Sequence, residues 1–142
     1  MVKVGSYLYL AKKDLQSAHQ ISELGDTGLF ARLCEQAVEK AFKHYIHLKG
    51  TPEDQPLLFI HKPYRLYKRC KELGVTLEFN EDEKDILRTL DDYYFDTNYP
   101  GNSWFEPERD DVAEALKLSD KVVSYVELYF GDITPSSVFN KK

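Results

Sequence analysis

Apolar residues recur every three or four positions along almost the whole chain, which is the spacing of helices that bury one face. Five segments show this spacing, and their apolar stripes fall within residues 4–18, 30–48, 66–73, 86–94 and 112–130. Only residues 75–79 alternate with a period of two, and that stretch is short enough to be a linker. Short connections favour antiparallel neighbours. The sequence therefore predicts an all-α, five-helix up-and-down bundle.

Several helix ends are marked by residues with known end preferences. Pro63 suits the first turn of the third helix. Asn80 and Glu83 have the spacing of a capping box that opens the fourth. Gly50 suits a left-handed C-terminal cap for the second helix, and Gly74 ends the third. The fourth helix is expected to break within residues 98–101.

Two details of packing follow from the apolar positions. Residues 57–60 form a short apolar run, which we expect to pack as a plug over the bundle. The last helix is expected to turn one stripe inward, made of Val112, Leu116, Ser119, Val123, Val126 and Phe130.

Composition fits one folded domain. The chain has 142 residues, of which 42% are hydrophobic and 13% aromatic, enough for a core without cross-links. We expect residues 1–131 to form a single domain and residues 132–142 a mobile tail. No stretch is apolar for about 18 residues, and the first residues lack the apolar core and cleavage site of a signal peptide. A cytoplasmic protein with no membrane partner is expected.

The net charge of −5 hides an asymmetry. Residues 1–71 hold 12 basic and 7 acidic residues, whereas residues 72–142 hold 7 and 17. The two halves thus carry charges of +5 and −10. Either the basic half presents an electropositive face, or the two halves neutralise each other in the fold.

Signals for metal binding and nucleophilic catalysis are weak. His44 and His47 lie three residues apart, but no further ligand spacing accompanies them, and a solvated helix face explains them. Cys34 and Cys70 fall on apolar stripes, where cysteine acts as a small hydrophobic residue. No glycine-rich phosphate loop occurs. We expect no catalytic residue, no metal site and no cofactor.

One stretch combines charge with a titratable ring. His61, Lys62 and Arg65 lie at the predicted start of the third helix, where backbone N–H groups can help to bind a phosphate. The alternative is that His61 caps the helix and the basic residues only keep the surface hydrated.

A second stretch, residues 93–105, is rich in aromatic residues. Its rings include Tyr94, Tyr99, Trp104 and Phe105, which could stack on bases or bury against a partner subunit. The alternative is a loop folded back over its own core.

Four segments together resemble the HEPN (higher eukaryotes and prokaryotes nucleotide-binding) domain family. They are residues 9–18, residues 33–43 with their QAVEKAFK sequence, residues 61–66 as an H-x-[LP]-x-x-L segment, and Asn98-Tyr99-Pro100 in place of R-Y-P. The resemblance covers about residues 3–130. It implies an all-helical bundle that often forms a homodimer and is often paired with a minimal nucleotidyltransferase as toxin and antitoxin.

Some members of the family are metal-independent ribonucleases that use Arg followed by four to six residues and His. In this chain no Arg precedes a His at that spacing, and Asn98 stands where relatives carry Arg. Whether the chain is an enzyme stays open, and these departures favour a non-catalytic domain. The leading hypothesis is binding of a nucleotide or RNA, or of a partner nucleotidyltransferase, at His61, Lys62, Arg65, Asn98 and Tyr99. The alternatives are a homodimeric interaction module without a nucleotide site, and an atypical ribonuclease toxin.

Overall fold

The computed structural model of the chain describes residues 6–21, 27–98 and 109–130. Five α-helices and one 3₁₀-helix lie within them: α1 (Tyr7–Ile21), α2 (Thr27–Lys49), η1 (Pro52–Phe59), α3 (Pro63–Glu72), α4 (Glu81–Asn98) and α5 (Arg109–Phe130). These ranges contain no strand, so the all-α prediction is confirmed. The added element, η1, occupies the predicted connector. The predicted tail, residues 132–142, lies outside the described residues.

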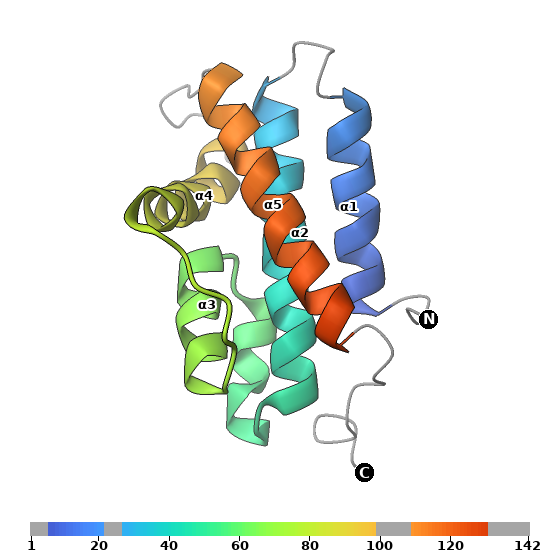
Figure 1. Cartoon of the computed structure of the whole chain (residues 1–142), viewed down its shortest axis with the longest axis vertical. Coiled ribbons are helices and arrows are strands. Elements are labelled where there is room, and N and C mark those ends of the chain that lie inside the picture. The colour runs from blue at the N-terminus through green and yellow to red at the C-terminus, as the bar shows by residue number, and fades with distance from the viewer. Residues whose placement is uncertain (1–5, 22–26, 99–108, 131–142) are drawn as a thin grey trace.

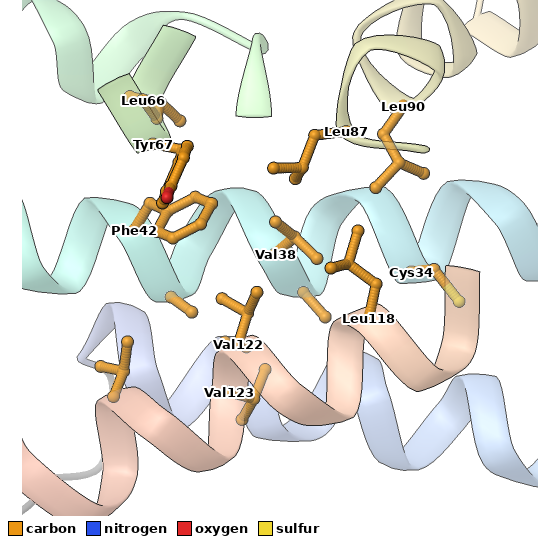
Figure 2. Close-up of a cluster of buried hydrophobic side chains, with 14 of the residues drawn as sticks. Cys34, Val38, Phe42, Leu66, Tyr67, Leu87, Leu90, Leu118, Val122 and Val123 are labelled. Carbon is orange, nitrogen blue, oxygen red and sulfur yellow. The ribbon is translucent and has the colours of Figure 1, made fainter. Parts of the chain in front are cut away.

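Helix α2 is the centre of the bundle, since each of the other helices packs against it. Figure 1 shows α1, α2 and α5 along the long axis, with α3 beside one half of α2 and α4 seen nearly end-on. The core forms between α2 and its neighbours (Figure 2). It includes Cys34, Val38 and Phe42 of α2, Leu66 and Tyr67 of α3, Leu87 and Leu90 of α4, and Leu118, Val122 and Val123 of α5.

Because α2 is enclosed on most sides, its polar residues are buried with its apolar ones. Residues 41–46 are buried without a break, although they include Lys43 and His44. Glu35 and Glu39, further along the same helix, are buried as well. No helix in the described parts of the chain is both long and apolar enough to cross a membrane.

The predicted ends of α3 and α4 are confirmed. The N–H of Asn80 donates to Oε1 of Glu83 at 2.9 Å, and the N–H of Glu83 donates to Oδ1 of Asn80 at 2.8 Å, which completes the capping box. Gly74 has a φ of 111°, and the N–H of Val75 reaches back 3.0 Å to the carbonyl of Cys70. That bond is part of a C-terminal cap that glycine permits.

The prediction for Gly50 is wrong, because Gly74 is the glycine with a positive φ among the described residues. Gly50 follows α2, and its N–H donates to the carbonyl of Ile46 at 2.7 Å. A Cβ at position 50 would lie 2.6 Å from that oxygen and 3.0 Å from Oδ2 of Asp54. The position requires glycine because a Cβ would clash with the last turn of α2 itself and press on Asp54 of η1, not because the backbone is left-handed.

The inward face of α5 is wider than its predicted stripe. Ala115, Leu118 and Val122 are buried although the stripe omits them, whereas Leu116 is only partly buried. The face is broad because α5 packs against both α1 and α2.

The predicted apolar plug is confirmed only in part. Leu58 is buried, and Leu57 and Ile60 pack against the core, but Phe59 is 73% exposed.

Candidate functional site

The site begins at the short link between η1 and α3, where His61 meets the buried face of α2. Nδ1 of His61 lies 3.0 Å from Oε1 of Glu39. A carboxylate oxygen only accepts hydrogen bonds, so Nδ1 carries the hydrogen and donates it. The side chain of His61 is 39% exposed and that of Glu39 only 4%. A buried carboxylate therefore orients a half-exposed imidazole ring.

Glu39 is stabilised as an anion inside the protein. Burial opposes its charged form, but hydrogen bonds from Glu35 and Lys43, with the charges of Lys43 and His61, outweigh burial and lower the pKa of Glu39. Nζ of Lys43 donates to the same Oε1 at 2.6 Å, and both side chains are almost fully buried. The i,i+4 pair that the spacing of these two residues indicates thus exists, but it lies in the interior.

Glu35 lies one turn from Glu39 on α2 and is fully buried. The interaction of Glu35 with Glu39 is one of the causes that lower the pKa of Glu39. Glu35, Glu39 and Lys43 thus form a buried polar cluster, with His61 at its edge.

Lys62 and Arg65 extend from this edge into solvent. Both side chains are exposed, and within the described ranges neither forms an ion pair. We call His61, Lys62 and Arg65 the basic corner. The described part of the chain thus shows that His61 is adjacent to these two cations at the start of α3, as the sequence predicts.

Some cations of the basic half are neutralised within the fold and others are not. Arg69 donates to both carboxylate oxygens of Asp54, at 2.7 and 2.9 Å, and to Oε1 of Glu72 at 3.0 Å. Lys71 pairs with Glu78 of the acidic half. By contrast, neither Lys62 nor Arg65 pairs with a carboxylate in the part of the chain that the structure describes.

The start of α3 adds to the positive character of the corner. Lys62 is the N-cap residue and makes no side-chain hydrogen bond to the first turn, and Pro63 occupies the first helical position. The N-terminal end of a helix carries a partial positive charge and favours anions. Backbone and side chains therefore favour the same kind of ligand.

The remaining predicted site residues are placed only in part. Asn98 is the last residue of α4, and Tyr94 lies in the same helix, but their side chains are outside the described part of the structure. Tyr99, Trp104 and Phe105 lie outside the described residues altogether. The structure thus brings together the basic corner, and the role of the aromatic stretch stays a prediction.

Sequence reasoning missed the residues behind the corner. The signal for the burial of Glu39 is its position between Ala37, Val38 and Ala41 on a helix with few polar faces. The solvated face predicted for His44 is wrong, because that ring is only 2% exposed. The ring is covered because α1 packs against α2, and its Nδ1 accepts a hydrogen bond there from the N–H of Leu8, at 3.3 Å.

The cysteines behave as the sequence predicts. Burial raises the pKa of the Cys34 thiol to about 12 and raises that of Cys70 well above its ordinary value. Both thiols therefore stay protonated and act as small apolar groups. In the described ranges, no group of three or more His, Cys, Asp or Glu side chains is arranged to hold a metal ion.

Comparison with known proteins places this geometry in context. A family profile described as the HEPN domain matches residues 4–129. Among solved structures, the chain is similar to the crystal structure of TT1696 from Thermus thermophilus, with 26% sequence identity and a TM-score of 0.63. That similarity covers 86% of this chain and 94% of the other. A search of curated protein sequences gives no match.

Proposed function

This chain belongs to the HEPN domain family, and from that premise we propose that its basic corner binds phosphate groups of a nucleotide or an RNA. The observation that carries the proposal is that Lys62 and Arg65 are exposed and have no acidic partner among residues 6–21, 27–98 and 109–130, beside a histidine that a buried carboxylate orients. Binding without catalysis is proposed because no Arg precedes a His by four to six residues anywhere in the chain.

Each residue of the corner has a distinct role in this proposal. Arg65 offers a planar fork that can donate two hydrogen bonds to one phosphate, whereas Lys62 contributes a mobile point charge. His61 adds a ring whose orientation is fixed through Nδ1 by Glu39. Asn98 and Tyr99 are added to the proposed site from the sequence alone.

A binding experiment with a matched control tests the corner. A fluorescein-labelled 12-nucleotide RNA is titrated by anisotropy and ATP by calorimetry. Wild type is compared with Lys62→Ala/Arg65→Ala and with Lys13→Ala/Lys117→Ala, which removes two exposed lysines from α1 and α5. We expect the corner variant to bind about tenfold or more weakly, since hydrogen bonds to charged groups contribute about 1.5–3 kcal/mol each.

Salt dependence gives a second readout of the same variants. Each phosphate contact to a single strand contributes about 0.7 to the slope of log K against log salt, so removing both cations should lower the slope by about 1.4. The control should keep the wild-type slope. Equal binding and equal slopes for the corner variant and the control would overturn the proposal.

A second candidate function is an interaction module, because HEPN domains are commonly dimeric. In this version the chain forms a homodimer, or binds a minimal nucleotidyltransferase as one half of a toxin–antitoxin-like pair, through the stretch around Tyr99, Trp104 and Phe105. Sedimentation at micromolar concentration tests the homodimer. Co-purification with a neighbouring nucleotidyltransferase tests the pair.

The third candidate, an atypical metal-independent ribonuclease, has a direct test. Incubation with RNA in EDTA should give cleavage above a buffer control if the chain is such an enzyme, and His61→Ala should abolish that cleavage.

A further inference from the structure

An exposed aromatic ring lies next to the basic corner in the chain. Phe59 is the last residue of η1 and is 73% exposed, whereas Leu57, Leu58 and Ile60 around it turn toward the core. The apolar run therefore presents only its aromatic member to solvent. A single exposed apolar residue is common in proteins, so its meaning depends on what holds the ring and what surrounds it.

The segment that carries Phe59 is fixed at several points. Asp54 of η1 accepts two hydrogen bonds from Arg69 of α3, and its Oδ2 also accepts from the N–H of Thr51 at 2.9 Å. Pro52 and Pro56 restrict the backbone of η1 further. A ring on a rigid segment loses little conformational entropy when a ligand stacks on it, which favours binding.

The segment that follows the ring holds more cations than anions. No Asp or Glu occurs from position 55 to position 71. Arg69 and Lys71 of that segment pair with carboxylates, whereas Lys62, Arg65 and Lys68 form no ion pair with the described residues. Phe59 and Lys62 are three residues apart, so their Cα atoms are separated by at most about 11 Å. Stacked nucleotides are about 3.4 Å apart along a strand, so a strand of about three nucleotides is long enough to contact both Phe59 and Lys62.

We infer that Phe59 is a stacking platform for an unpaired base, and that the ligand of the basic corner is a single-stranded nucleic acid. This inference rests on the proposed function, because the corner supplies the phosphate contacts. In a duplex the bases are stacked on one another and their faces are not available to a protein ring, whereas a single strand offers both faces and phosphates. A protein partner is less favoured, since the other large apolar side chains that are exposed among the described residues, Leu10, Leu29 and Leu128, lie on α1, α2 and α5.

The test compares ligands and variants by fluorescence anisotropy. The probes are a labelled 12-nucleotide oligouridine, a labelled RNA duplex of the same length, and UMP as competitor. The variants are Phe59→Ala, Phe59→Leu and Phe59→Trp, with Leu128→Ala as the control for loss of an exposed apolar side chain. Circular dichroism melting confirms that each variant folds.

Stacking predicts a specific order of affinities. Oligouridine binds more tightly than the duplex and than UMP. Phe59→Ala and Phe59→Leu weaken oligouridine binding about tenfold, within the range for loss of one base–aromatic stack. Phe59→Trp retains or strengthens binding, and Leu128→Ala leaves it unchanged.

Other results overturn the inference, and they can be told apart from failure of the proposed function. If Lys62→Ala/Arg65→Ala weakens binding but Phe59→Ala does not, the corner binds phosphate without stacking and only the inference fails. Full affinity in Phe59→Leu, or equal affinity for duplex and single strand, overturns it in the same way. If wild type binds none of the probes, both the inference and the proposed function fail.

Discussion

Nδ1 of His61 donates a hydrogen bond to Oε1 of Glu39 over 3.0 Å, so a residue in the middle of α2 sets the position of a ring on the surface. The two residues are 22 positions apart in the chain, and one is almost completely buried while the other is half exposed. A change to the interior of α2 is therefore transmitted to the basic corner without any contact between α2 and a ligand.

The first prediction concerns the charge of Glu39. Glu39→Gln leaves the buried ammonium group of Lys43 without its anion, and breaking a buried pair in this way costs about 3–5 kcal/mol of the free energy of unfolding. Urea denaturation measures the loss. Glu35→Gln is the matched control, because it places an amide of the same size at a buried position one turn away, where it can donate a hydrogen bond to Glu39, and it should cost about 1 kcal/mol or less. Equal losses in the two variants would contradict the assignment of the anion to Glu39.

The second prediction concerns acid stability. Hydrogen bonds from Arg69, followed by that from the N–H of Thr51, lower the pKa of Asp54 below its ordinary value of 3.8 despite burial. The unfolded chain therefore binds more protons than the folded chain between the folded pKa and 3.8, and stability rises with pH there. The contribution of Asp54 is fully present above 3.8 and is lost as pH falls through the folded pKa.

Denaturation at a series of pH values from 2 to 6 measures this effect in wild type and in Asp54→Asn. The variant should be less stable than wild type at pH 6, and the difference between the two should shrink toward pH 2. A constant difference across this range would show that Asp54 acts through its shape and not through its charge.

The third prediction contrasts two glycines. Gly50→Ala places a Cβ 2.6 Å from the carbonyl oxygen of Ile46, so the backbone must shift and the contacts of Asp54 with it. At Gly74→Ala the Cβ makes only an ordinary contact, 3.4 Å from the hydroxyl of Tyr45, but it imposes a side chain on a φ of 111°, which costs about 1–2 kcal/mol. We expect Gly50→Ala to have the lower melting temperature. A greater loss in Gly74→Ala would mean that the end of α2 and Asp54 accommodate the added Cβ at low cost.

The fourth prediction concerns the start of α1. The N–H of Leu8 has its partner in Nδ1 of His44, so His44→Leu leaves a buried backbone donor unsatisfied, at a cost of about 1–3 kcal/mol. Amide hydrogen exchange at Leu8 should become faster, and urea denaturation should show the lower stability. His19→Leu changes an exposed histidine and should have little effect on either measurement. Unchanged exchange at Leu8 in His44→Leu would exclude this capping role.

The sequence predicted best what depends on local chemistry. The capping box of Asn80 and Glu83 and the turn at Gly74 are decided by neighbouring residues, so they could be identified without the fold. Gly50 is also a glycine, but what surrounds it is the carbonyl oxygen of Ile46 and the side chain of Asp54, and the exact backbone path that brings them close cannot be read from the sequence pattern.

The site was predicted in part for the same reason. His61, Lys62 and Arg65 are close in sequence, and one helix start keeps them together. Glu39 lies close enough to bond His61 only because η1 and the link after it fold back against α2. Glu39 is buried because the other helices pack around α2. When the polar positions of a helix are all assigned to its solvent-exposed face, the sequence pattern cannot indicate that a charged residue such as Glu39 is buried.

The buried charges of α2 affect whether this helix can insert into a membrane. A helix of 23 residues is about 34 Å long, enough to cross the hydrocarbon core of a bilayer. If all buried positions of α2 were apolar, the helix could be inserted into a membrane by the translocon while the chain is being synthesised. Each charged residue near the middle of a spanning helix costs about 2.5–3.5 kcal/mol on insertion, and α2 holds Glu39, Lys40 and Lys43 there. Glu39 and Lys43, which support His61 in the folded protein, are thus also charges that disfavour insertion of this helix into lipid.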